Sequence, residues 1–526
     1  MKIAAKKLGH LLQALCLAGL AGTALADAPL VHIDGGPVRG QASAAVAAFK
    51  GIPFAKPPVG ELRWRPPQAP AAWHDVREAK AFGPDCLQVP LPGDSAPLSV
   101  TPAEDCLYLN VWTPARFKGR RLPVMVWIYG GGFVNGGSSP AEYDGTAFAR
   151  DHVVLVSFNY RLGNFGFFAH PALSAEQAGG PLGNYGYMDQ IAALKWVQRN
   201  IAAFGGNPRN VTVFGESAGG MAVNALLSSP LAAGLFQKAV IESGAGRTGL
   251  PSRALSGGPN SAEATGLALA QSFGIQGSDA QALAKLRATP AETLLGNLNM
   301  VTMGSNRNYV GGPIEDGQLN LGTPVVQYAA GKAQRVPLIV GANSMDIGLL
   351  RAASLDQLVA QFGPDADAAR AAYAPTADTN VGLAVFRAGG DQMMIEPARE
   401  IARLLSAHQP TYEFRFSYVA ESLRAKTPGA PHASEIPYVF DTVSAHYGKD
   451  LTAADAAAAK AMHAYWVGFA RTGVPQAAGQ PAWPAYEPST DQIMDFTAQG
   501  PVAGPDPWKD RMDLAQRFAE RRASGN

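Results

Sequence analysis

Residues 215–219 read Gly-Glu-Ser-Ala-Gly and match the nucleophile-elbow pattern G-x-S-x-G. The preceding residues, Val-Thr-Val-Phe at 211–214, form a short apolar run typical of a buried parallel strand, and residues 221–227 are compatible with a helix. Such a tight turn strains the serine backbone, and the flanking glycines leave room because they carry no Cβ. The sequence therefore predicts that Ser217 is a nucleophile held above a sheet, beside the positive end of a helix.

A serine hydroxyl attacks well only when a base accepts its proton. The chain has nine histidines, of which His10 lies in the N-terminal segment. Seven others fall at element edges or on polar helix faces, where surface or structural roles are usual: His32, His74, His152, His170, His408, His446 and His463. His432 differs, since it lies in a loop (429–435) after a predicted strand at 412–418. Enzymes with this elbow carry their serine, acid and histidine in that chain order, which favours His432 as the base.

The acid that orients such a histidine should follow a strand. Residues 336–340 predict a strand that runs into Gly-Ala-Asn-Ser-Met-Asp at 341–346, so Asp346 would lie at its carboxyl end. There it would orient the imidazole and stabilise the imidazolium formed during catalysis. The alternative is that Asn343, Ser344 or Asp346 caps the N-terminus of a helix. The residues alone favour neither interpretation.

A triple glycine follows another predicted strand. Residues 122–129 are apolar and lead into Gly-Gly-Gly-Phe at 130–133. Glycines at such a place let backbone N–H groups face a pocket unobstructed, as an oxyanion hole requires. Ala218, which follows the predicted nucleophile, would supply a further donor. A flexible surface loop is the alternative reading of the glycines.

The first 26 residues predict a signal peptide. Lys2, Lys6 and Lys7 form a basic region, residues 11–20 are mostly apolar, and Ala-Leu-Ala at 24–26 fits a cleavage site. The mature chain would then begin at Asp27 and be secreted or periplasmic. A buried N-terminal helix is the alternative. The apolar run is too short to span a bilayer.

The remaining composition narrows the class of protein. The formal net charge is +1, which favours neither nucleic acid nor an anionic membrane as a partner, and no other segment predicts stable membrane insertion. Cysteine clusters and the H-E-x-x-H pattern are absent from the sequence, so we expect no metal and no cofactor. The sequence does not specify an oligomeric state, and a monomer is the default expectation.

Only Cys86 and Cys106 remain once the leader is removed. In an exported protein an even pair favours a disulfide, here closing a loop rich in proline, serine and glycine. Such a loop would contribute about 3 kcal/mol in the chain-entropy model. Two separate buried thiols are the alternative.

Strand-like runs alternate with helical stretches along the chain. The clearest strands are predicted at 122–129, 153–159, 211–214, 238–242, 336–340 and 412–418, and the clearest helices at 189–200 and 453–471. This alternation predicts an α/β fold over residues 27–526, with a mostly parallel central sheet covered by helices on both faces. Irregular residues 245–335 predict helical insertions above the sheet. Glycine- and proline-rich residues 245–260 and 500–507 predict surface excursions.

At this point the chain resembles the type B carboxylesterases, the branch of the α/β-hydrolase fold that includes the cholinesterases. The resemblance covers nearly the whole mature chain. Residues 204–208 (Phe-Gly-Gly-Asn-Pro) and 213–220 (Val-Phe-Gly-Glu-Ser-Ala-Gly-Gly) resemble the family's serine signature, and 104–110 (Glu-Asp-Cys-Leu-Tyr-Leu-Asn) resemble its second signature. Further matches are at 51–55, 159–163, 183–186 and 433–438.

The resemblance implies roles for particular residues. It implies Ser217, Asp346 and His432 as the triad, and Gly131, Gly132 and Ala218 as the oxyanion hole. It further implies a Cys86–Cys106 disulfide and two buried ion pairs, Arg63 with Glu104 and Arg161 with Asp189, which would be costly to break singly.

Three features depart from the family pattern. The acid is usually glutamate rather than Asp346, and a glycine usually stands at Ile347. Tyr129 precedes the glycines where many members have histidine. The segment 86–106 contains no tryptophan, which cholinesterases use there to bind a quaternary ammonium, so we do not expect choline esters as substrates.

The resemblance implies a serine carboxylic-ester hydrolase that forms an acyl-enzyme on a small-molecule ester. Feruloyl, tannin, polyester and toxin-detoxifying esterases, and amidases, would use the same triad, and a non-catalytic binding module is the alternative from another class. Glu216 would either adjust the field around His432 or be purely structural. Four methionines, at 300, 303, 393 and 394, would either line an apolar pocket or pack in the core.

Overall fold

The computed structural model describes residues 28–247, 253–306, 309, 311–376 and 378–524. The predicted signal peptide lies outside these residues. Within them the main element is an 11-stranded sheet with the strand order β16-β15-β14-β13-β10-β9-β7-β8-β6-β4-β3. A small sheet of β1 (Leu30–Ile33), β2 (Gly36–Arg39) and β5 (Arg77–Glu78) lies near the N-terminal end, and β11 (Arg253–Ala254) pairs with β12 (Ile314–Glu315).

The centre of the main sheet is parallel and its two edges are antiparallel. Parallel pairing joins β7 to β8 and β9, and then continues through β10, β13 and β14 to β15. The bounds are β7 Leu122–Ile128, β8 Val154–Phe158, β9 Gly206–Glu216, β10 Lys238–Glu242, β13 Leu338–Asn343, β14 Thr411–Phe416 and β15 Gln492–Thr497. Antiparallel strands complete the edges: β3 Gln41–Ala42, β4 Val46–Pro53, β6 Tyr108–Pro114 and β16 Gly500–Pro505. The predicted mostly parallel sheet is confirmed.

Two predictions about the sheet need correction. The strand predicted at 336–340 is β13, which begins only at Leu338 and runs on to Asn343. Pro337 has no N–H and so cannot donate to the ladder. The predicted surface excursion at 500–507 is wrong, since Gly500–Pro505 forms β16 and pairs with β15. Proline is tolerated there because β16 is an edge strand with one unpaired side.

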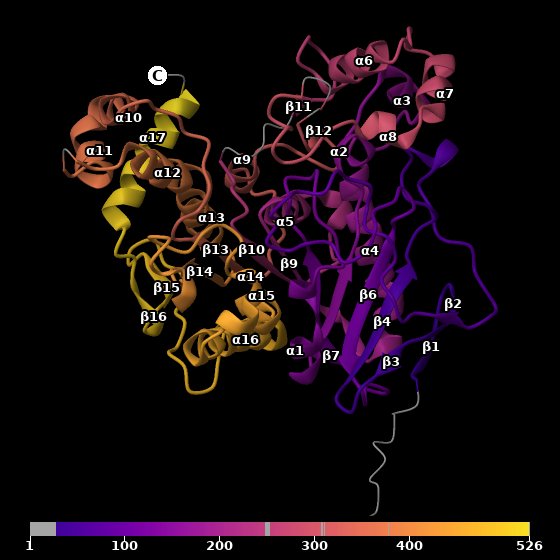
Figure 1. Cartoon of the computed structure of the whole chain (residues 1–526), viewed down its shortest axis with the longest axis horizontal. Coiled ribbons are helices and arrows are strands. Elements are labelled where there is room, and N and C mark those ends of the chain that lie inside the picture. Colours follow the sequence, from indigo (N-terminus) through magenta and orange to yellow (C-terminus); the bar gives the residue numbers. More distant parts are fainter. Residues whose placement is uncertain (1–27, 248–252, 307–308, 310, 377, 525–526) are drawn as a thin grey trace, which may run out of the picture.

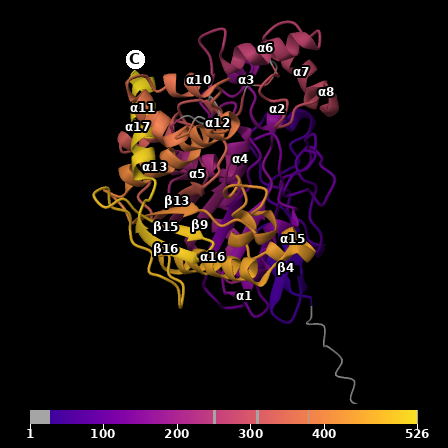
Figure 2. The same ribbon diagram turned by 60° about the vertical axis from the view of Figure 1, so that its left-hand side comes forward.

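Helices cover both faces of the sheet (Figures 1 and 2). On one face α5 and α13 pack against β9, β10, β13 and β14, and on the other α1 and α16 meet through the rings of Phe148 and His463. The helices are α1 Thr146–Arg150, α2 Gly163–Gly166, α3 Pro171–Glu176, α4 Tyr185–Asn200, α5 Ala218–Ser228, α6 Ala262–Ser272, α7 Ala280–Ala288, α8 Ala291–Leu295, α9 Pro324–Ala329, α10 Leu355–Ala360, α11 Ala366–Tyr373, α12 Val381–Gly390, α13 Glu396–Leu405, α14 Ile436–Val439, α15 Val443–Tyr447, α16 Ala453–Thr472 and α17 Lys509–Ser524.

Two groups of inserted helices stand above the sheet in Figure 1. The group at the top right contains α6, α7 and α8, and the group at the upper left contains α10, α11 and α12 beside the C-terminal helix α17. The first group falls within residues 245–335, so the predicted helical insertions are confirmed for the part of that segment that the structure describes.

Covalent and ionic cross-links join distant parts of the N-terminal half. Cys86 and Cys106 form a disulfide. Arg63 contacts Glu104 at 2.6 Å and Arg161 contacts Asp189 at 2.7 Å, which confirms both expected ion pairs. The guanidinium of Arg63 also donates to the carbonyls of Arg287 and Thr289, so this pair anchors the end of α7 to the N-terminal region.

None of the helices in the described ranges has the length and apolar character that a membrane span requires.

Candidate active site

The turn between β9 and α5 has the geometry of a nucleophile elbow. Ser217 has φ +56° and ψ −122°, a conformation that non-glycine residues rarely adopt, and its N–H donates to the Glu242 carbonyl at 2.9 Å. The glycines are required sterically: a Cβ on Gly219 would lie 2.0 Å from the Ile128 carbonyl oxygen. The surrounding strands therefore hold the strained serine in place.

His432 lies within hydrogen-bonding distance of both Ser217 and Asp346. His432 Nε2 is 2.9 Å from Ser217 Oγ, and His432 Nδ1 is 2.6 Å from Asp346 Oδ1. Ser217 follows β9, Asp346 follows β13, and His432 lies in the long loop after β14. The three residues thus come from the carboxyl ends of parallel strands, where ligands bind in open α/β sheets.

Asp346 is held as a charged carboxylate. Its Oδ2 accepts hydrogen bonds from Ser243 Oγ at 2.7 Å and from the Asn343 N–H at 3.0 Å. Burial alone would raise the pKa of this carboxyl, but His432 and these donors outweigh it and hold the pKa below its ordinary value. A helix-capping role is not what the structure shows, because β13 continues to Asn343 and residues 344–350 form no helix.

The acid loop and the histidine loop are joined by direct hydrogen bonds. The Met345 N–H donates to the Ala430 carbonyl, and the Ala430 N–H donates to Ser344 Oγ, both at 2.9 Å. Asn343 Nδ2 donates to the Pro431 carbonyl at 2.7 Å and to Glu435 Oε2 at 2.5 Å. These contacts fix the position of His432 relative to Asp346.

A second carboxylate faces His432. Glu216 Oε1 lies 3.1 Å from Nε2, and Glu216 is 3% exposed. Burial raises the pKa of Glu216 well above its ordinary value. Burial by itself would lower the pKa of His432, but the charges of Glu216 and Asp346 reverse that effect and raise it.

The triple-glycine loop lies directly against the elbow. A Cβ on Gly130 would lie 2.8 Å from the Glu216 carbonyl oxygen and 2.9 Å from Ser217 Cβ. In the described part of the chain, the N–H groups of Gly131 and Gly132 donate no hydrogen bond to another protein group. Ala218 begins α5, so its N–H has no partner within the helix. These three N–H groups are therefore available to an incoming oxyanion.

Two stacked tyrosines support the start of this loop. The rings of Tyr129 and Tyr160 lie 4.4 Å apart, and each hydroxyl donates to the other residue's carbonyl, at 3.1 and 2.8 Å. Tyr129, which stands where many relatives have histidine, is thus a buried structural residue. It fixes the end of β7 immediately before Gly130.

The four methionines separate into two pairs. Met393 and Met394 are buried in a small apolar cluster with Met512, so core packing is correct for them. Met300 and Met303 instead lie over the glycine loop: a Cβ on Gly132 would be 3.3 Å from Met303 Sδ and 3.4 Å from Met300 Cγ. The second pair therefore lies beside the site.

Sequence reasoning missed two buried groups at the site, Ser243 and Glu435. Ser243 directly follows β10, so the rule that placed Asp346 after a strand would also have singled it out. Glu435 follows His432 by three residues, and burial raises its pKa to about 7. Ser243 carried no motif of its own, whereas Glu435 lies in the matched segment 433–438, which assigned it no role.

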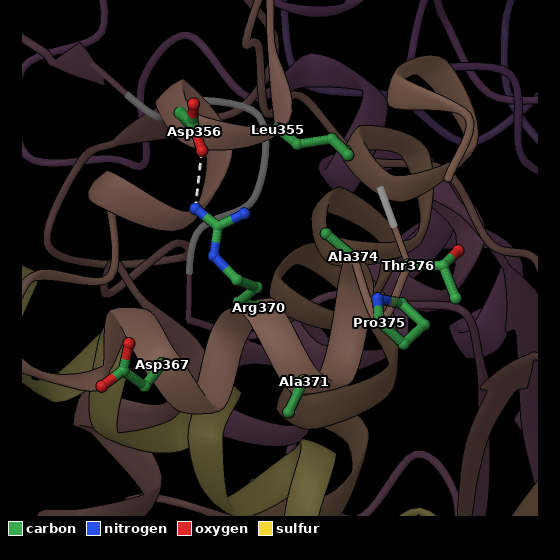
Figure 3. Close-up of a pocket in the computed structure, with 8 residues that line it drawn as sticks. All are labelled: Leu355, Asp356, Asp367, Arg370, Ala371, Ala374, Pro375 and Thr376. Atoms are coloured by element: carbon green, nitrogen blue, oxygen red, sulfur yellow. Dashed lines mark hydrogen bonds and ion pairs between the residues drawn. The ribbon is translucent and has the colours of Figure 1, made fainter. Parts of the chain in front are cut away.

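A surface cavity of about 750 Å³ lies elsewhere, between α10 and α11 (Figure 3). Its lining residues all fall within 355–376, and its charged pair, Asp356 and Arg370, is exposed and mutually bonded at 2.6 Å. Ser217, His432 and Asp346 do not line it.

The parallel sheet, the elbow after β9 and the convergent Ser217, His432 and Asp346 define an α/β-hydrolase. The model of the carboxylesterase family matches residues 27–505. The chain is 38% identical to a fumonisin B1 esterase of Sphingopyxis macrogoltabida over 89% of this chain and 86% of that protein. It is 36% identical to the para-nitrobenzyl esterase of Bacillus subtilis (strain 168), over 88% and 94%.

Solved structures agree with these sequence relatives. A para-nitrobenzyl esterase structure superposes with a TM-score of 0.78 at 32% identity, covering 93% of this chain and 99% of that one. The chain therefore belongs to the carboxylesterase family, and it is a serine carboxylic-ester hydrolase.

Proposed function

We propose that Ser217, His432 and Asp346 form the catalytic triad and that hydrolysis proceeds through an acyl-enzyme on Ser217. His432 Nε2 takes the Ser217 proton as the hydroxyl attacks the ester carbonyl. Asp346 orients the ring through Nδ1 and stabilises the imidazolium. The N–H groups of Gly131, Gly132 and Ala218 stabilise the oxyanion of the tetrahedral intermediate.

The second half of the reaction uses the same groups. His432 gives its proton to the leaving alcohol, and then removes a proton from the water that attacks the acyl-enzyme carbonyl. The second tetrahedral intermediate collapses, releasing the acid and returning the proton to Ser217. No step needs a redox change or a further co-substrate.

The continuous contact from Ser217 through His432 to Asp346 carries this proposal. We expect Ser217→Ala to lower turnover of a p-nitrophenyl short-chain ester by several orders of magnitude, and to abolish labelling by a fluorophosphonate probe. Ser228→Ala, in the same helix but away from the turn, is the matched control and should retain both. Full activity of Ser217→Ala would refute the assignment, and an unlabelled wild-type chain would favour a binding module.

The acyl group of the substrate is proposed to be apolar. Met300 and Met303 lie beside Gly132, so an acyl chain bound next to this glycine would contact flexible, apolar thioether side chains. A panel of p-nitrophenyl esters graded by acyl length and branching tests this idea, with Met303→Phe as the variant expected to shift the preference to shorter acyl groups. An unchanged preference would exclude Met303 from the acyl site.

A detoxifying esterase is the second candidate, because a relative that is 38% identical is named fumonisin B1 esterase. Adding esters with a bulky alcohol portion to the same panel distinguishes a detoxifying esterase from an esterase for simple acyl esters. Higher kcat/KM for bulky alcohols than for p-nitrophenyl esters would favour detoxification.

We also propose that residues 1–26 direct export to the periplasm or the extracellular medium and are then removed. The Cys86–Cys106 disulfide supports an oxidising compartment. N-terminal sequencing of the natural protein should begin at Asp27, and a retained Met1 would contradict export.

A further inference from the structure

The direction of one oxyanion-hole donor depends on a single peptide plane. The carbonyl and N–H of a trans peptide point in opposite directions, so the Gly131 carbonyl fixes where the Gly132 N–H points. This carbonyl accepts hydrogen bonds from the N–H groups of Val134 at 3.1 Å and Asn135 at 2.9 Å. Gly131 and Gly132 have positive φ angles, +101° and +64°. Because glycine adopts many backbone conformations readily, these residues do not by themselves fix the orientation of the peptide between them. Something else must hold it.

Asn135 is anchored by its side chain. Its Nδ2 donates to the Val89 carbonyl at 2.7 Å and to Gln88 Oε1 at 3.2 Å, and its Oδ1 accepts from the Met300 N–H at 2.9 Å. Asn135 is 1% exposed, so these bonds do not compete with bulk water. One amide therefore ties the glycine loop both to the disulfide-bonded segment and to the methionine segment above it.

Gln88 anchors the next residue in the same way. Its Oε1 also accepts from the Gly136 N–H at 2.9 Å, and its Nε2 donates to the Gly136 carbonyl at 2.5 Å and the Cys86 carbonyl at 2.9 Å. Gln88 is buried and lies two residues from the disulfide at Cys86. We call the two side chains, Gln88 and Asn135, the amide clamp.

We propose that the amide clamp positions the oxyanion hole: it holds the Gly131–Gly132 peptide with its N–H toward the ester carbonyl. Gln88 and Asn135 are positioning residues, since they touch the loop backbone and not the reacting atoms. Phe133, between the glycines and Asn135, has φ +61°, a strained value for a bulky residue that persists only when its surroundings hold it. Phe133 itself is held by edge contacts with the rings of Phe167 and Tyr187 and by the Gly163 N–H, which donates to its carbonyl at 2.7 Å. The clamp holds Asn135 and Gly136, which follow it. This inference rests on the proposed role of Gly132.

Loss of the clamp should weaken transition-state stabilisation more than substrate binding, because the oxyanion forms only during reaction. Removing one oxyanion donor costs about 10²–10³ in kcat, and a loosened donor should cost less, roughly 10- to 100-fold. A purely structural role would instead lower ground-state binding and the fraction of active sites that can be titrated, together with kcat.

The test uses Asn135→Ala and Gln88→Met in the full chain, with Ser99→Ala as control. Gln88→Met keeps the approximate side-chain volume and removes the hydrogen bonds. Ser99 is an exposed residue of the same disulfide-bonded segment, and it forms hydrogen bonds with Ser139, beyond the glycine loop.

Four quantities are measured on enzyme whose active sites have been titrated. They are kcat, KM, the affinity for a trifluoromethyl ketone and the affinity for the matching alcohol. The ketone is chosen because its adduct with the serine places an oxyanion in the oxyanion hole.

We expect kcat to fall roughly 10- to 100-fold in both clamp variants while KM stays within about threefold. Affinity for the ketone should fall by the same factor as kcat/KM, and affinity for the alcohol should not change. Ser99→Ala should match the wild type in all four. Two results would overturn the inference. One is a wild-type kcat in the clamp variants. The other is a loss of alcohol affinity and of the fraction of titratable active sites that parallels the loss of kcat.

Gln88 and Asn135 lie on different segments of the chain. If one of the two variants does not fold, the other alone is enough to test the inference. The two proposals can be refuted separately. Full activity of Ser217→Ala would refute the proposed function. Wild-type kcat in the clamp variants, with turnover still dependent on Ser217, would refute only the role of the clamp.

Discussion

Glu216 Oε1 lies 3.1 Å from Nε2 of His432, the same ring nitrogen that lies 2.9 Å from the Ser217 hydroxyl. The histidine therefore has a carboxylate at each nitrogen, Glu216 at Nε2 and Asp346 at Nδ1. Both charges favour the imidazolium and raise the pKa of His432. Because a base must be neutral to accept a proton, this arrangement moves the onset of activity toward higher pH.

Glu216→Gln should shift the acid limb of the kcat/KM profile to lower pH. The substitution keeps the shape of the side chain but removes one charge that raises the pKa of His432, so the ring becomes neutral at a lower pH. The measurement is kcat/KM for a p-nitrophenyl ester across pH, and Glu263→Gln, on α6, is the matched control. An acid limb that stays in place would show that Glu216 is a structural carboxylate.

Asp346→Asn should lower kcat by about 10⁴, because the amide no longer fixes the reactive tautomer of His432 or stabilises its charge. Asp346→Glu, which introduces the residue usual in the family, should lower kcat by a smaller factor. It keeps the charge but places an extra methylene in a site where Asp346 is 1% exposed, which typically costs about 1–3 kcal/mol of stability. Steady-state kinetics and thermal unfolding measure both effects. Equal activity of the asparagine variant and the wild type would remove Asp346 from the triad.

Arg161→Met should destabilise the fold by about 3–5 kcal/mol, since it leaves Asp189 buried without its partner. Burial already raises the pKa of Asp189, which shows the cost of an isolated charge at this place. Urea unfolding measures the loss of unfolding free energy. Combining Arg161→Met with Asp189→Leu should restore most of the lost stability. The control is Arg370→Ala in the exposed pair of Figure 3, expected to cost no more than about 1 kcal/mol.

Replacing Cys86 and Cys106 together by serine should lower the unfolding free energy by about 3 kcal/mol in the chain-entropy model, because the unfolded chain regains the freedom of the closed loop. Chemical denaturation of oxidised wild type and the double variant compares the two. The fully reduced wild type is the natural control, and it should match the variant. No difference in stability would mean that packing around residues 86–106 holds the segment without the bond.

Local patterns predicted the elements correctly where contiguous residues carry the physical constraint. The elbow at 215–219 needs glycines because its neighbours approach within 3 Å of any added Cβ, and that constraint is visible in five residues. Apolar runs likewise predicted β7, β8, β10 and β14 to within two residues at each end. The pattern failed at Gly500–Pro505, because pairing at a sheet edge depends on β15, not on the segment itself.

Asp346 was open to two interpretations in the sequence, an acid or a helix cap, and the fold places its carboxylate at Nδ1 of His432. Its catalytic role stays a prediction, as do the roles of Ser217 and His432. The sequence by itself determined the class of fold, the strained serine and the glycine loop, since each is encoded by short contiguous stretches. Tertiary structure alone decided that Ser243 meets Asp346 across 103 residues and that Gln88 meets Asn135 across 47. Hydrogen bonds act over about 3 Å, and only the register and packing of the whole sheet set distances between loops that finely.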